Sequence, residues 1–359
     1  MDNQRNNRNF DTLTPELKLR INGNDLPNAA KADLIAVSVT EDIDAISMCS
    51  FELLSWDGKE MKVKWIDDAL FAEGNPVEIQ VGYRDKLQTL FKGEITGLEP
   101  DFDTAEPPTL TVRGYDRRHR LMRLRRTHAF LNMKDSDIAS QIASGAGLTP
   151  DVKDSRVTLD YVLQHNQTDL EFLEERARHI GYEVIVSDRS LQFRPRNNSQ
   201  SEVLTLRREV ELLKFHPRLT TIGQVQEVQV RGWNPQQKQA WVARSAIGDE
   251  GPLMRGSNSG PAVASRAFGN TGSTLVDSPV QSQAEADQLA KGRFGEMALH
   301  YIVGHGICIG QPELRAGKVV KIEGLGKRFS GLYYVTLTEH AYKPKTGYRT
   351  AFTVRRNAT

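Results

Sequence analysis

The chain has 359 residues, with 47 Lys and Arg against 46 Asp and Glu, so its formal net charge is +1. At roughly 150 residues per domain, this length predicts two or three domains. The near-neutral charge argues against a general nucleic-acid coat or a binder of anionic membranes. No apolar run approaches the roughly 18–20 residues that a membrane helix needs. Cys49 and Cys308 are the only cysteines, which argues against a disulfide framework or zinc site and indicates folding in a reducing compartment.

Alternating strands are predicted in the first third of the chain. Residues 1–14 are expected to form a flexible N-terminal arm. From residue 15 apolar and polar residues alternate, as at Leu17, Leu19 and Ile21, which is typical of a half-buried strand. Similar runs, separated by turn signals such as residues 22–25, recur as far as Arg113. This spacing predicts a first antiparallel β-barrel over residues 15–126.

A small α+β module is predicted over residues 127–200. Apolar residues at helical spacing predict a helix over Asp135–Ala146. The capping box Thr168-Asp169-Leu170-Glu171 opens a second helix, for which Gly181 is a fitting stop. Two strands are expected to follow, over Tyr182–Val186 and Leu191–Arg194.

The β signals return from residue 201 and predict a second barrel over 201–359, with a helix over 283–300. Ser245–Pro279 contains six Gly and three Pro with little periodicity. It is therefore predicted to be a long insertion, either solvated or ordered by a partner. A short echo between Val112–Asp116 and Val230–Asn234 suggests two related barrels. The predicted fold is thus a β-rich α+β fold: two tube-like antiparallel β-barrels with an intervening small α+β module.

No catalytic, cofactor-binding or metal-binding residue is predicted. The sequence has no GxSxG elbow, HExxH helix or P-loop. His300 and His305 are the closest histidine pair, but their spacing does not place them on one helix face. Glu171, Glu174 and Glu175 are interpreted as a solvated helix face with ion pairs.

The most unusual stretch is an arginine cluster in Arg113–His128. Nucleic-acid binding is one interpretation, but Tyr115 is the only aromatic residue in the run. Acidic stretches such as Glu99–Glu106 could neutralise the cluster across a subunit contact, and arginine suits paired carboxylate contacts. The predicted interface residues are these arginines and one aromatic residue of the insertion: Arg113, Arg117, Arg118, Arg120, Arg123, Arg125, Arg126 and Phe268.

The sequence resembles the phage late control D family, the hub proteins of contractile tails, whose domain also forms the N-terminal part of VgrG spikes. The resemblance covers residues 15–359. It rests on the order and spacing of short matches: Val112-Arg113-Gly114-Tyr115-Asp116, Asp169–Leu173 running to Gly181-Tyr182, Val230–Pro235, Ala284–Asp287, Leu314–Val319, Phe329–Val335, His340 and Gly347–Thr350.

The resemblance implies a structural baseplate hub of a contractile injection apparatus, either a phage tail or a phage-like particle. Such hubs are homotrimers around a central channel, so that six barrels adapt a threefold spike to a sixfold inner tube. The implied partners are the inner tube protein, a separate OB-fold or needle spike protein and other baseplate proteins. Assembly in the cytoplasm without membrane insertion or a cofactor is expected.

Two features leave alternatives open at this stage. VgrG-type chains continue into an OB-fold and a needle, whereas this sequence stops at Thr359, so either a separate spike protein or a shortened chain is expected. The alternative functions are a spike-associated enzyme, such as a cell-wall hydrolase, and a nucleic-acid-binding module that uses Arg113–Arg126.

Overall fold

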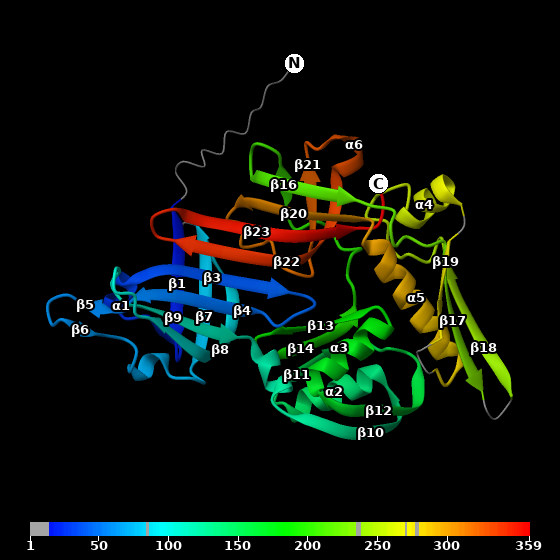
Figure 1. The fold of residues 1–359 in the computed structure, drawn as a ribbon, viewed down its shortest axis with the longest axis horizontal. Coiled ribbons are helices and arrows are strands. Elements are labelled where there is room, and N and C mark those ends of the chain that lie inside the picture. Colours follow the sequence, from blue (N-terminus) through cyan, green and yellow to red (C-terminus); the bar gives the residue numbers. More distant parts are fainter. Residues whose placement is uncertain (1–13, 84–85, 235–237, 270, 277–279) are drawn as a thin grey trace, which may run out of the picture.

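The structure is a computed structural model that describes residues 14–83, 86–234, 238–269, 271–276 and 280–359 (Figure 1). All but the last residue of the predicted arm over 1–14 lies outside the described residues. A mostly antiparallel sheet of 13 strands takes most of its strands from the two ends of the chain, and three of the four smaller sheets come from the middle. This arrangement confirms the predicted β-rich α+β fold.

The N-terminal half of the large sheet, here called the first β-unit, surrounds its own hydrophobic core. Its strands run in the order β3-β4-β9-β8-β7-β1-β2. Inward residues of these strands, such as Phe51, Ile79 and Val112, pack in one cluster with Phe71. The elements of this part are β1 (Pro15–Ile21), β2 (Asn24–Asp25), α1 (Asn28–Ala32), β3 (Leu34–Asp42), β4 (Met48–Leu54), β5 (Trp56–Asp57), β6 (Lys62–Val63), η2 (Ala69–Phe71), β7 (Pro76–Tyr83), β8 (Lys86–Asp101) and β9 (Thr109–Tyr115).

The other half of the large sheet, the second β-unit, is built around a separate core that includes Leu314, Tyr333 and Phe352. It joins the first β-unit edge to edge, because β22 pairs with β3 in antiparallel register from Leu337↔Asp42 to Tyr342↔Val37. Its elements are β15 (Thr205–Arg207), β16 (Leu212–Leu219), β20 (Ile302–Ile309), β21 (Val319–Glu323), α6 (Gly326–Phe329), β22 (Gly331–Lys343) and β23 (Gly347–Arg356).

In Figure 1 the α+β module lies below the second β-unit and beside the lower part of the first, and it has its own core. Thr168 caps α3 as its sequence predicts: its hydroxyl accepts from the Glu171 N–H, and the Glu171 carboxylate accepts from the Thr168 N–H. Phe172 and Leu173 on the buried face of α3 pack in this core. The elements are η3 (Arg117–Met122), β10 (Arg125–Lys134), α2 (Asp135–Gly145), β11 (Thr149–Val152), β12 (Thr158–Thr168), α3 (Asp169–His179), β13 (Tyr182–Ser187) and β14 (Ser190–Pro195).

The predicted extent of the second barrel needs a correction. Strands β17 (Glu227–Asn234) and β18 (Gln239–Ala246) do not join the large sheet but form a small sheet with β19 (Gly272–Leu275). Helix α5 (Gln283–Leu299) covers this sheet, since Ala286 and Ala290 are small enough to pack against Val230 and Ala243. The sequence echo therefore joins β9 of the large sheet to β17 of a different sheet, so it does not mark equivalent barrel strands.

The insertion Ser245–Pro279 is also more ordered than its composition predicts, although residues 270 and 277–279 lie outside the described residues. It contains α4 (Gly260–Phe268), whose first turn is capped by the Ser259 hydroxyl. Met254 is buried in a cluster with Tyr334, and the Gly260 N–H donates to the Asn357 carbonyl. Its described residues form no core cluster of their own, and Met254 and Leu275 pack against residues from other parts of the chain.

Candidate functional site at the junction of three units

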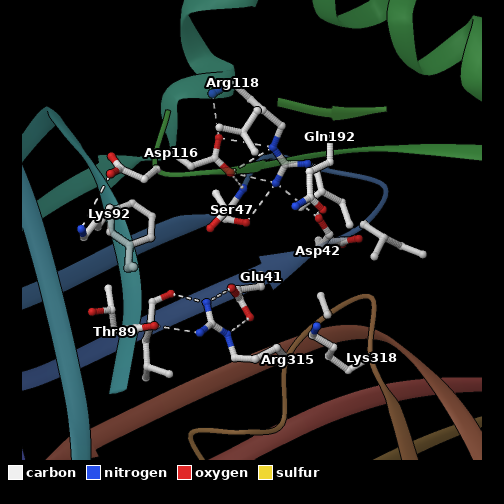
Figure 2. Close-up of a pocket in the computed structure, with 18 of the residues that line it drawn as sticks. Glu41, Asp42, Ser47, Thr89, Lys92, Asp116, Arg118, Gln192, Arg315 and Lys318 are labelled. Atoms are coloured by element: carbon white, nitrogen blue, oxygen red, sulfur yellow. Dashed lines mark hydrogen bonds and ion pairs between the residues drawn. The ribbon is translucent and has the colours of Figure 1, made fainter. Parts of the chain in front are cut away.

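A pocket of about 410 Å³ lies where the first β-unit, the second β-unit and the α+β module meet (Figure 2). Glu41 and Lys92 come from the first β-unit, Arg315 from the loop before β21, and Gln192 from β14. Two guanidinium groups stand on opposite sides of it in Figure 2, Arg118 on one and Arg315 on the other. The contacts around this pocket therefore hold the three units in position relative to one another.

Arg118 ties the first β-unit to the α+β module. Its side chain is 1% exposed and forms a salt bridge of 2.9 Å with Asp116, which is 4% exposed. The remaining guanidinium N–H groups donate to the Ser47 hydroxyl at 2.9 Å and, at 3.4 Å, to the carbonyl of Val184 in β13. A buried charge is tolerated when it is both paired and hydrogen-bonded, as here.

Glu94 of β8 contacts a second set of basic side chains at the same boundary. Arg117 Nε lies 3.3 Å from its carboxylate, His119 Nε2 lies 2.9 Å away, and Arg120 forms an ion pair with it. Arg117 also pairs with Asp188 in the β13–β14 turn of the module. Burial opposes ionisation of Glu94, but the hydrogen bonds and charges of Arg120 and His119 prevail, so the pKa of Glu94 is lowered.

Arg315 joins the second β-unit to the first. Its guanidinium forms a two-pronged contact with Glu41 of β3, with Nε 2.6 Å from Oε2. It also donates to the carbonyls of Thr89 at 2.8 Å and Leu90 at 2.7 Å, both in β8. Burial of Glu41 opposes its ionisation, but Arg315 outweighs this effect and the pKa of Glu41 is lowered. This planar, two-pronged geometry is specific to arginine.

His340 of β22 supports the loop that carries Arg315. Its Nε2 lies 3.0 Å from the carbonyl of Leu314, the residue before Arg315, and its Nδ1 lies 2.6 Å from the Tyr348 hydroxyl. The side chain is 2% exposed, and burial lowers the pKa of His340 to about 4. A neutral ring that donates from Nε2 and accepts at Nδ1 satisfies both contacts.

Most arginines of the predicted cluster form ion pairs with carboxylates of the same chain. Besides the pairs above, Arg113 contacts Glu99 at 2.6 Å, Arg125 contacts Glu171 at 2.8 Å and Arg126 lies 3.7 Å from Asp169. Arg123 lies 3.1 Å from His119 Nδ1. The structure places Phe268 at the end of α4, 74% exposed, and it does not line the pocket. A role of these residues between chains stays a prediction.

Sequence reasoning did not assign a role to Glu41, Arg315 or His340, although His340 and the 314–319 segment belong to the matches that carried the family resemblance. Glu41 and Arg315 are 274 positions apart, so no local motif announces their contact. Within the part of the chain that the structure describes, no group of three or more His, Cys, Asp or Glu could hold a metal ion. None of the described helices is long and apolar enough to cross a membrane. The charged side chains at this junction fix one another rather than point at a shared reacting position.

The fold, two core-bearing halves of one sheet with an α+β module between them in sequence, is shared with solved tail proteins. The structure is similar to the prophage MuSo2 43 kDa tail protein from Shewanella oneidensis, with a TM-score of 0.71 and 12% identity over 96% of this chain and 98% of that chain. A tail protein from Neisseria meningitidis MC58 is similar with a TM-score of 0.68 and 13% identity, over 96% of this chain and 97% of that chain. An E. coli component of the type VI secretion system is similar with a TM-score of 0.61 and 15% identity, over 95% of this chain and 77% of that chain. That component exhibits structural similarity to T4 bacteriophage tail proteins.

The chain belongs to the Alg8 N-terminal domain family, whose model matches residues 11–343. No curated protein sequence matches it. The likeness to tail proteins and to the type VI component confirms, at the level of the fold, the resemblance to hub proteins and VgrG.

Proposed function

We propose that the chain is a structural hub of a contractile injection particle, such as a phage tail or a related secretion apparatus. The observation that carries the proposal is the extent of the fold match, which spans 96% of this chain and 98% of the prophage tail protein. A match of this extent includes both β-units and the module between them, rather than one common supersecondary motif.

The arrangement of the two β-units supports a homotrimer. Each unit has its own core, and the β3–β22 pairing holds the two side by side. Three copies would present six such units, which suits a part that adapts a threefold spike to a sixfold inner tube. Closed rings are the usual outcome of identical subunits with a rotational interface. The proposed partners are the inner tube protein, a separate spike protein and other baseplate proteins.

The junction pocket suits this role because a ring of six units closes only if each pair keeps one relative orientation. Arg315 makes the orientation of the two β-units specific through a partly buried, multiply bonded guanidinium group, and Arg118 fixes the α+β module against the first β-unit. The same contacts disfavour the nucleic-acid alternative, since Arg117 and Arg118 are 7% and 1% exposed and pair with carboxylates. No observation on the described residues favours the enzyme alternative.

The proposal predicts a trimer in solution. Native mass spectrometry of the 40.3 kDa chain is expected to show a species of about 121 kDa, alone or with the candidate tube protein. Replacing Arg125 and Arg126 with glutamate tests the predicted interface, because both side chains are 54% exposed. We expect this double variant to shift the population toward monomer.

A matched control is Lys59→Glu, which changes an exposed charge in the turn between β5 and β6. It should leave the mass distribution unchanged. A chain that stays monomeric at micromolar concentration with tube and spike proteins present would contradict the trimer. A normal trimer in the Arg125 and Arg126 variant would remove these arginines from the interface but leave the hub proposal standing.

A further inference from the structure

A second pocket, of about 420 Å³, lies at the C-terminal end of the second β-unit and has a strongly cationic lining. Four of its lining residues are Arg255, Lys321, Lys327 and Arg356, and no Asp or Glu side chain lines it. In Figure 1 the C-terminus, α6 and β21 lie at this end of the molecule. The pocket is separate from the junction described above and shares no lining residue with it.

Arg356 is the central feature of this pocket. The residue is 3% exposed, and its Nη1 donates to the Ser330 carbonyl at 3.0 Å. The guanidinium lies over the Tyr333 ring, 5.5 Å from its centroid, while Nε is buried with no hydrogen-bond partner. Among the residues that the structure describes, no carboxylate forms an ion pair with Arg356. A buried guanidinium stays charged, so leaving it without an anion is costly.

The backbone makes room for this guanidinium. Gly331 has φ +146°, and a Cβ built on it would lie 2.7 Å from Arg356 Cζ. Any other residue at position 331 would therefore be strained in the backbone and would push the guanidinium aside. The position of the Arg356 guanidinium therefore depends on a glycine at the first residue of β22.

The other cations are arranged around Arg356 with their counter-ions at the periphery. Arg255 pairs with Glu202 at 3.3 Å, and Lys321 pairs with Glu323 at 2.6 Å. Lys327 is exposed, and in the described part of the chain no carboxylate lies within ion-pair distance of its ammonium group. The main-chain oxygen of Thr359 accepts from the Ser257 and Asn258 N–H groups. The terminal carboxylate of Thr359 also lines the pocket, but among the described residues neither Arg356 at the floor nor Lys327 at the rim forms an ion pair with an anion.

We propose that this pocket is an oxyanion-binding site that takes a carboxylate or phosphate group. Arg356 would contact the anion from the floor with its planar donors, and Lys327 would add a point charge from the rim. The anion has two possible sources, a free ion or an acidic side chain of a neighbouring protein. The inference uses only the local geometry and does not depend on the hub proposal.

The test is calorimetric titration of the full chain at low salt with two probes, inorganic phosphate and a blocked tetra-aspartate peptide. The wild-type chain is expected to bind at least one of them with a 1:1 ratio at concentrations of ~10 mM or below. Lys327→Glu is expected to weaken binding at least about 10-fold, because it reverses the rim charge. Arg356→Gln is expected to abolish binding, and Lys59→Glu is the matched surface control that should change nothing.

The outcomes separate the sources. Tighter binding of the peptide than of phosphate supports an acidic side chain of a partner, and binding of phosphate alone supports a free ion. Binding of neither probe overturns the proposal, as does binding that survives Lys327→Glu. If Arg356→Gln fails to fold by circular dichroism, the Lys327 variant still decides, because its exposed side chain carries no described packing contact.

Discussion

The Arg118→Leu variant is expected to unfold at a lower urea concentration than the wild-type chain, with a loss of about 3–5 kcal/mol in the free energy of unfolding. The reason is that the carboxyl group of Asp116, 4% exposed, would be left in a buried site without its partner cation. Leucine also leaves the Ser47 hydroxyl and the Val184 carbonyl without the donors that Arg118 supplies. The measurement is a urea denaturation curve followed by circular dichroism.

Arg126→Leu is the matched control for this prediction. Arg126 is an arginine of the same cluster, but its side chain is 54% exposed and lies 3.7 Å from Asp169. A pair whose arginine is exposed and whose atoms are this far apart is expected to contribute at most about 1 kcal/mol. Equal losses in the two variants would show that burial of the Arg118–Asp116 pair does not control the stability of this boundary.

The sequence predicted best where a short motif fixes its own structure. The Thr168–Glu171 capping box needs only four adjacent residues to satisfy two N–H groups, and α3 begins where it predicts. The strand over Pro15–Ile21 likewise follows from alternation, since Leu19 and Ile21 are buried on one face. These features depend on residues that are neighbours in sequence, so they can be predicted without knowledge of the tertiary structure.

The features that the sequence did not reveal depend on distant partners. The antiparallel pair of β10 and β12 was not predicted from the sequence, because its outer face carries Leu131, Tyr161 and Leu163, which are 43–61% exposed. Apolar residues on both faces hide the alternation that marks a half-buried strand. In the same way, β17 and β18 have the alternation of barrel strands, and only their pairing in the structure, with α5 packed against them, shows that they form a separate sheet.

The candidate site shows the same division. The arginine cluster stands out by composition, and its preference for carboxylates follows from the chemistry of guanidinium groups. Which carboxylates it meets does not follow, because Arg117 reaches Asp188 across 71 positions. The two-pronged contact between Arg315 and Glu41 cannot be predicted from local composition, since each is a single charged residue in an ordinary strand or loop.

Stability is expected to fall as the pH is lowered from 6.5 to 4, and His340 is expected to account for about 3 kcal/mol of that fall. The folded chain holds the pKa of His340 at about 4, against 6.5 for the unperturbed side chain, chiefly because the ring is buried. Between these two values the unfolded chain binds the proton and the folded chain does not. The contribution of His340 is therefore fully present above pH 6.5 and is lost as the pH falls toward 4.

The experiment compares urea denaturation midpoints at pH 7 and pH 4.5 in the wild-type chain, in His340→Gln and in His305→Gln. A glutamine at 340 keeps an amide donor for the Leu314 carbonyl but does not titrate, so its pH dependence should be flatter. His305 is an exposed histidine of β20 bonded to the Thr353 hydroxyl, and its replacement should leave the wild-type slope intact. Glu41 acts at lower pH, because its lowered pKa keeps it ionised until the pH falls below the ordinary value of 4.5. A His340→Gln slope equal to that of the wild-type chain would mean that folding does not lower the pKa of His340, and this prediction would then be wrong.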